Sequence, residues 1–123
     1  MNLETYYEYC LSKKGTTEHF PFDKDTLVFK VGRKMFALSS LLQLENVAPK
    51  VNLKCNPDYA QELRVAYDKI QPAFHMSKVH WNTIAINSEV SDKFVKELID
   101  DSYELVFKSL TKKIQSEILE LEN

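Results

Sequence analysis

The chain has 123 residues, a formal net charge of −2 and only two glycines. This length suits one domain, so we expect residues 1–123 to form a single domain. Apolar residues make up 44% and charged residues 28%, which is enough to bury an ordinary globular core. The two glycines, Gly15 and Gly32, are too far apart for a P-loop and too few for a dinucleotide-binding loop. The net charge excludes a strongly basic nucleic-acid binder.

The cysteines and the N-terminal residues indicate the compartment. Cys10 and Cys55 lie far apart and form no CxxC pair, so we expect two reduced thiols. The first residues lack the basic and apolar regions of a signal peptide, and no apolar run approaches the length of a membrane helix. We therefore expect a cytoplasmic protein that acts without a membrane.

Charge is distributed unevenly along the chain. Residues 26–83 hold eight basic and four acidic side chains, whereas residues 89–123 hold five basic and nine acidic ones. The middle of the chain is therefore basic and its end acidic. This asymmetry is compatible with an anionic partner at the middle of the chain.

The first third of the chain predicts a helix and a hairpin. Residues 2–13 repeat apolar side chains at three- and four-residue spacing, and Gly15 is a natural stop. Residues 16–25 are turn-rich. Residues 26–31 and 34–38 are apolar, β-branched runs separated by Gly32-Arg33, which predicts a hairpin with a type II′ turn.

The strict alternation of the hairpin predicts its two faces. In that register the core face would hold Leu27, Phe29, Val31, Phe36 and Leu38. The opposite face would hold Val28, Lys30, Met35 and Ala37.

The remaining elements alternate between strands and helices. Residues 51–55 predict a strand, and Asn56 can cap a helix that runs towards Ile70. Residues 73–76 and 80–86 predict two more strands. In the second of these Ile84 and Ile86 should face the core, with Trp81 and Thr83 opposite. Ser91 can cap a long final helix, whose acidic end we expect to fray.

These elements predict an α+β fold. The order α-β(3)-α-β(2)-α, with short hairpin connections, favours a two-layer sandwich. We expect a mostly antiparallel five-stranded sheet with the helices packed on one face.

The sequence contains no recognisable catalytic or metal-binding motif. A nucleophile elbow and an HExxH motif are both missing, and the histidine and cysteine spacings match no zinc pattern. Cys55 with His75 or His80 could form a thiolate pair, but Cys55 falls on a predicted core face, where it acts as a small hydrophobe. We expect no catalytic residue, metal or cofactor.

The uncovered sheet face is the most informative candidate site. It should collect Lys30, Asn52, Lys54, Trp81 and Thr83. Its lysines could hold phosphates while Trp81 stacks on a base. The structural alternative is that Trp81 packs over Val28 and Met35 and the polar side chains are only solvated.

Several separate motifs resemble the MmcQ/YjbR-like family of bacterial proteins. They occur in the same order as in the family and cover nearly the whole chain. They are residues 28–38, 53–57, 63–64, 72–76, 78–83, 98–100 and 102–103.

The resemblance implies an α-β(3)-α-β(2)-α sandwich and DNA binding, without a set of catalytic residues. The polar motif positions that it carries over are Lys30, Lys34, Lys54, Arg64, His75, Lys78, His80, Trp81 and Asn82. Two features depart from the family pattern. Arg33 stands where the hairpin often has a second glycine, and residues 113–123 add an acidic end, which weakens attraction to phosphate.

Three hypotheses follow. The first is weak, salt-dependent binding of nucleic acid by the open face and the Arg33/Lys34 tip. The second is a protein-interaction module that receives a peptide or helix over Val28, Met35 and Trp81. The third is a small-molecule sensor or enzyme that uses a pocket near His75, His80 and Asn82. In each case we expect a monomer.

Overall fold

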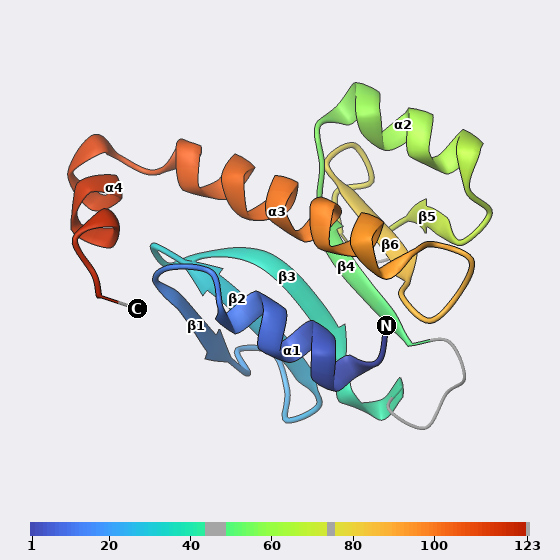
Figure 1. Cartoon of the computed structure of the whole chain (residues 1–123), viewed down its shortest axis with the longest axis horizontal. Coiled ribbons are helices and arrows are strands. Elements are labelled where there is room, and N and C mark those ends of the chain that lie inside the picture. The colour runs from blue at the N-terminus through green and yellow to red at the C-terminus, as the bar shows by residue number, and fades with distance from the viewer. Residues whose placement is uncertain (44–48, 74–75, 123) are drawn as a thin grey trace.

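The computed structural model describes residues 1–43, 49–73 and 76–122 (Figure 1). Its helices are α1 (Leu3–Leu11), α2 (Pro57–Ala66), α3 (Asp92–Ser109) and α4 (Lys112–Leu119). Its strands are β1 (Thr16–His19), β2 (Thr26–Val31), β3 (Lys34–Ser40), β4 (Lys50–Lys54), β5 (Ile70–Pro72) and β6 (Trp81–Ala85), and a 3-10 turn, η1 (Leu41–Gln43), follows β3. None of these helices is long and apolar enough to cross a membrane.

The strands form one antiparallel sheet in the order β1-β2-β3-β4-β6-β5, with α1 and α3 lying across one face (Figure 1). The predicted α+β sandwich is thus confirmed. The sheet has one strand more than predicted, because β1 pairs with β2 from Thr16↔Val31 to His19↔Val28. The expectation of turns throughout residues 16–25 was wrong at β1. This strand is polar and lies at the sheet edge, so it lacks the apolar alternation that marks a buried strand.

Side-chain caps begin the helices, at the predicted Asn56 and Ser91 and also at Asn2, which the sequence analysis placed inside the helix. Asn2 Oδ1 accepts from Thr5 N at 2.8 Å, and Ser91 Oγ accepts from Phe94 N at 3.1 Å. Asn56 caps α2 in the same way, with Pro57 at its first position. These caps satisfy amide groups that a helix leaves without internal partners.

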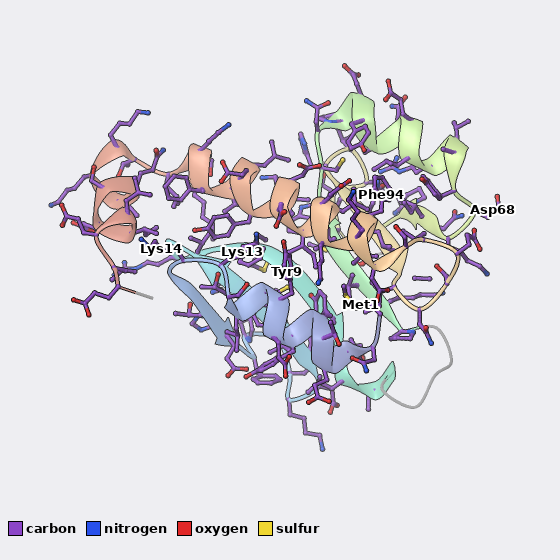
Figure 2. The ribbon with its side chains drawn as sticks, viewed as in Figure 1. Met1, Tyr9, Lys13, Lys14, Asp68 and Phe94 are labelled. Atoms are coloured by element: carbon purple, nitrogen blue, oxygen red, sulfur yellow. The ribbon has the colours of Figure 1, made fainter. Side chains whose placement is uncertain are left out.

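Helices α1 and α3 are held together by a polar contact above the sheet. The Tyr9 hydroxyl donates to Asp100 Oδ1 at 2.7 Å, and the Lys13 ammonium forms an ion pair with the same carboxylate. Figure 2 shows Tyr9 on α1 and Lys13 just beyond the end of this helix, both at the border with α3. Lys13 also lies over the Tyr9 ring, 4.7 Å from its centroid. This contact fixes the relative position of the two helices that cover the sheet.

The turn between β2 and β3 is of a different type from the one predicted. Gly32 has φ 56° and Arg33 has φ 71°. Two successive positive φ values define a type I′ turn, whereas the expected type II′ turn needs only the first. Arg33 therefore occupies a conformation that costs a non-glycine residue about 1 kcal/mol.

A β-bulge in β3 overturns part of the predicted register. Phe29 pairs with Ala37 and Lys30 pairs with Met35, so Phe36 is an extra residue. Strict alternation placed Leu38 in the core and Ala37 opposite. The bulge reverses these two positions, because it turns Phe36 and Ala37 to the same side.

The main core lies between the sheet and the helices. It contains the predicted Leu27, Phe29, Val31, Phe36, Ile84 and Ile86 together with side chains from α1, α2, α3 and α4. A smaller buried cluster lies on the other face of the sheet. It consists of Val28, Leu38, Ala73 and Trp81, with Met35 and Met76 packed against it.

Ser102 ties α3 to the sheet beyond the last paired residues of β3 and β4. Its hydroxyl donates to Phe36 O at 2.5 Å and accepts from Lys54 N at 2.8 Å. Both backbone groups lie next to the final ladder pair, Ala37↔Leu53. A fully buried serine thus supplies the hydrogen bonds that the ladder no longer makes.

The second half of the chain differs from prediction at its boundaries. Helix α2 ends at Ala66, and Ile70 begins strand β5, several residues before the strand expected at 73–76; residues 74–75 lie outside the described residues. The final helix is interrupted at Leu110, and Thr111 caps the new helix α4. The end does not simply fray, because Ile118 is buried against the core.

The turn glycine yields the first prediction. A Cβ added at Gly32 would lie 2.5 Å from Leu110 Cδ1 and would keep the positive φ. We expect Gly32→Ala to lower the free energy of unfolding by about 1–3 kcal/mol, measured by urea denaturation. Arg33→Gly in the same turn is the matched control and should unfold at the wild-type urea concentration or above it. A wild-type midpoint for Gly32→Ala would contradict the packing of Leu110 against the turn.

Candidate functional site

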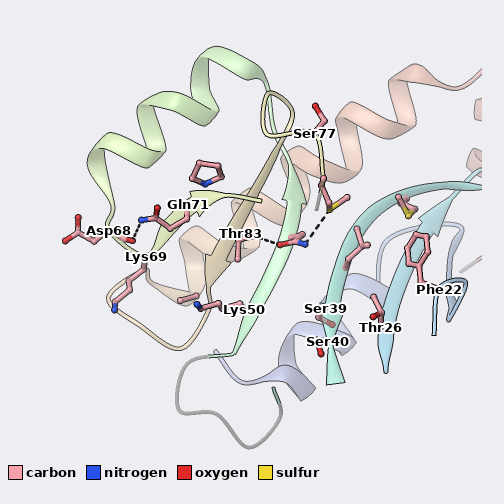
Figure 3. Close-up of a pocket in the computed structure, with 16 residues that line it drawn as sticks. Phe22, Thr26, Ser39, Ser40, Lys50, Asp68, Lys69, Gln71, Ser77 and Thr83 are labelled. Atoms are coloured by element: carbon pink, nitrogen blue, oxygen red, sulfur yellow. Dashed lines mark hydrogen bonds between the residues drawn. The ribbon is translucent and has the colours of Figure 1, made fainter. Parts of the chain in front are cut away.

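The sheet face opposite α1 and α3 carries a groove of about 890 Å³ (Figure 3). Its floor comes from β3, β4, β6 and β5. Phe22 stands at one end, and Asp68, Lys69 and Gln71 stand at the other, as Figure 3 shows. Four strand spacings of about 4.8 Å separate β2 from β5, so the groove crosses about 19 Å of sheet.

One row of paired residues runs across the floor of this groove. Leu38 pairs with Asn52, Asn52 with Thr83, and Thr83 with Gln71. The Thr83 hydroxyl donates to Asn52 Oδ1 at 2.6 Å, which directs Asn52 Nδ2 towards Met76 Sδ at 3.5 Å. The row therefore changes from an apolar side chain at β3 to hydroxyl and amide groups at β4, β6 and β5.

The groove face is basic. Among the described residues, the strand side chains on this face include Lys30, Lys50 and Lys54 and no carboxylate. Helices α1 and α3, which cover the other face, together carry seven acidic and three basic residues. The uneven charge noted along the sequence thus becomes a difference between two faces, which favours anions at the open face.

The loop before β2 holds Phe22 at the groove. Asp23 Oδ1 accepts from the backbone amides of Asp25 at 2.8 Å and Thr26 at 2.7 Å, and these bonds lower the pKa of the Asp23 carboxyl. Leu41 N donates to Asp25 O at 2.6 Å, which ties the loop to the end of β3. Phe22 is nevertheless 63% exposed. The loop therefore presents an aromatic ring on a braced backbone.

The structure brings only some of the predicted site residues to this face. Lys30 lies opposite Met35, and Lys54 lies opposite Trp81, so both lysines belong to the open face as expected. Arg33 is exposed at the hairpin tip. Lys34 is on the helix side, where its ammonium group donates to Ser109 Oγ at 3.3 Å. Lys34 is thus separated from the other lysines by the sheet.

Trp81 is a structural residue and not a stacking platform. It is 8% exposed and packs in the small cluster with Val28 and Leu38, close to Met35. This is the structural alternative considered for it above. A base cannot stack on a ring whose faces are already covered by protein atoms.

Arg64 and Asn82 form an internal polar contact. Arg64 Nε donates to Asn82 Oδ1 at 2.6 Å, and its Nη2 donates to the carbonyl oxygens of Lys78 and Trp81. Asn82 Nδ2 donates to Ala60 O at 3.4 Å, and the side chain is 1% exposed. These two residues therefore join α2 to β6 and to the turn before it. They do not face the groove.

The histidines and the cysteine do not form the thiolate pair considered above in the part of the chain that is described. His75 lies outside the described residues. His80 is exposed, and its carbonyl oxygen accepts from Cys55 N at 2.8 Å. The pKa of the Cys55 thiol is raised to about 11, chiefly by burial and to a smaller extent by the Asp101 carboxylate. The thiol therefore stays protonated at neutral pH. No cluster of metal-ligating side chains occurs in residues 1–43, 49–73 and 76–122.

Sequence reasoning missed several groove residues. Phe22 falls in a segment read only as a turn, and Lys50 just precedes a predicted strand. Lys69 was assigned to the end of the helix now seen as α2, and Gln71 to the connection after it. Their meeting depends on strand order. One signal was present, because a Phe-Pro-Phe run within a polar turn places large rings where burial is difficult.

The fold and groove define an α+β sandwich with one helix-covered sheet face and one open, lysine-bearing face. The family model named YjbR matches residues 11–105, and the chain belongs to this family. It is 37% identical to the uncharacterized protein YbdF of Escherichia coli O157:H7, covering 80% of this chain and 79% of that protein. It is 30% identical to the uncharacterized protein YjbR of Escherichia coli K12, covering 85% and 86%.

Solved structures agree with this assignment. The crystal structure of Deinococcus radiodurans protein DR2400, described as a DUF419 domain, matches with a TM-score of 0.87 and 34% identity, covering 99% of this chain and 93% of that one. A crystal structure of a Pseudomonas syringae protein matches with a TM-score of 0.74 and 30% identity, covering 86% and 99%.

The Arg64–Asn82 contact yields the second prediction. Asn82→Ala would leave Arg64 Nε and Ala60 O without their buried partner. We expect it to lower the free energy of unfolding by about 1–3 kcal/mol, measured by urea denaturation. His80→Ala, two residues away on the exposed turn, is the control and should change stability by less than about 0.5 kcal/mol. Equal stability of the two variants would refute the structural role of Asn82.

The third prediction concerns Asp101 on α3. Its pKa is raised above the usual value, chiefly by partial burial and to a smaller extent by the Asp100 and Glu97 carboxylates. A raised pKa means that the folded state disfavours the carboxylate, so stability falls as pH rises through that range. We expect Asp101→Asn to raise the urea midpoint at pH 7 and to have no effect below the ordinary Asp pKa of about 3.9. Glu62→Gln, at an exposed position of α2, is the control and should leave the urea midpoint unchanged at both pH values. A lower midpoint for Asp101→Asn at pH 7 would contradict the expected direction of the stability change.

Proposed function

We propose that this chain binds nucleic acid on the open face of its sheet, weakly and with a steep dependence on salt. The observation that supports the proposal is the separation of charge between the two faces. Lys30, Lys50 and Lys54 project from the strands of the open face, while carboxylates dominate the covering helices. Attraction of phosphate to such a face is chiefly electrostatic.

The proposal uses fewer residues than the sequence suggested. Trp81, Arg64 and Asn82 have structural roles, and Lys34 lies on the helix side. Three strand lysines can neutralise only a few phosphates, and the acidic helices repel the rest of the polymer. Both effects keep the affinity low and make it fall with added salt.

A protein partner is the second candidate function. Its support is the apolar end of the groove, where Met35, Leu38 and Met76 lie beside the exposed Phe22. Methionine-rich surfaces accommodate varied apolar side chains. A peptide held by apolar contacts would bind with little dependence on salt, so ionic strength separates the two candidates. In both cases we propose a monomeric binding protein of the cytoplasm and not an enzyme.

The fourth prediction tests the proposal by charge reversal. Fluorescence anisotropy of labelled oligonucleotides would give the affinity of the wild-type protein over a series of salt concentrations. We expect the logarithm of the affinity to fall linearly with the logarithm of the salt concentration. Lys54→Glu should weaken binding by about tenfold at low salt, because it removes one phosphate contact and adds a like charge.

Lys34→Glu is the matched control for this experiment. It makes the same change in net charge on the helix side of the hairpin, so it should bind within about twofold of the wild type. Circular dichroism would check that both variants fold. Equal weakening by the two variants would show that only net charge matters, and binding that is indifferent to salt would refute the proposal.

A further inference from the structure

The groove combines three kinds of contact that a nucleic-acid duplex cannot use together. Phe22 offers an aromatic ring at one end, Asn52 and Gln71 place amide groups along the floor, and Lys50 and Lys69 bring two ammonium groups, the second next to the Asp68 carboxylate in the chain. In a duplex the base faces are stacked and the pairing edges are occupied. In a single strand both are accessible.

Phe22 is the residue of this face that is placed to stack on a base. Its side chain is 63% exposed, whereas Trp81 is 8% exposed and enclosed. The Asp23 hydrogen bonds brace its loop, so the ring is held at the groove before a ligand arrives. A base that stacks on a held ring loses less conformational freedom than one that must order it.

The groove floor offers groups that suit a base edge. Asn52 and Gln71 side chains each carry a donor and an acceptor, which is the pairing pattern of nucleobase edges. Asn52 is oriented by the Thr83 hydroxyl and Gln71 by its bond to Asp68 O at 2.6 Å. The cavity of about 890 Å³ falls within the range of about 300–1,000 Å³ typical of small-ligand sites. It therefore suits a short unpaired segment and not a double helix.

We infer that the groove takes single-stranded nucleic acid, with one unpaired base against Phe22 and the chain running across the amide floor towards Lys50 and Lys69. This inference rests on the proposed function and specifies its partner. The charge of the face and the aromatic ring at its end select the ligand together. An anionic chain without bases would gain nothing from Phe22, and an apolar peptide would gain nothing from the lysines.

The test compares single strands with duplexes of the same sequence. Anisotropy at low salt would measure short labelled oligonucleotides, single-stranded and double-stranded, against the wild type, Phe22→Ala, Phe22→Tyr and Phe20→Ala. Base stacking on an aromatic ring contributes about 1–3 kcal/mol, so Phe22→Ala should weaken single-strand binding by about fivefold or more. Phe22→Tyr keeps the ring and should restore most of the affinity.

Phe20 provides the matched control, because it is 47% exposed on the same loop but does not line the groove. Phe20→Ala should bind single strands within about twofold of the wild type. Duplex binding should be weaker than single-strand binding and insensitive to Phe22→Ala. A free mononucleotide, added as competitor, should displace the oligonucleotide only at much higher concentration.

The failures are distinguishable. Equal binding of duplex and single strand, or no effect of Phe22→Ala, would overturn this inference. The Lys54→Glu variant and the salt dependence of binding would still test the proposed function separately. If the mononucleotide competes at the same concentration as the oligonucleotide, the ligand of the groove is a free nucleotide and not a strand. That result would also overturn this inference. No binding of any oligonucleotide at low salt would overturn the proposed function and this inference with it.

Discussion

A single extra residue in β3 decides which side chains of the sheet meet the helices. Phe36 has no partner opposite it in β2, so the residues on either side of the bulge change face. Phe36 and Ala37 both enter the main core, and Met35 and Leu38 share the open face. Without the bulge, strict alternation would bury Leu38 under the helices and remove an apolar part of the groove floor.

The apolar side chains of the open face bury one another in a small cluster, so this face needs no helix to cover it. Trp81 and Ala73 pack with Val28 and Leu38, and the short segment that leads to β6 is held by Arg64. Burial of this cluster removes the Trp81 ring from solvent, and the burial of apolar surface stabilises the fold. The groove lies beside the cluster, where polar floor residues replace apolar ones.

The candidate site thus depends on contacts that are not part of it. Asp100 joins α1 to α3, Ser102 joins α3 to β3 and β4, and Asn82 joins β6 to α2. Ser102 and Asn82 fix strands whose other faces line the groove, and Asp100 fixes the two helices that cover the opposite face. The lysines and Phe22 contribute charge and an exposed ring, while these buried polar contacts set the geometry between them.

The sequence alone determined the class of fold, the caps of α2 and α3 and the core face of β6, because these follow from local periodicity and hydrogen bonding. Lys30 and Lys54 could also be assigned to the open face from alternation. Only the tertiary structure decided the exchange of Ala37 and Leu38, the burial of Trp81 and the gathering of Phe22, Lys50 and Lys69 around one groove. These depend on a bulge and on strand order, and both arise from pairing between distant segments, which local patterns do not encode.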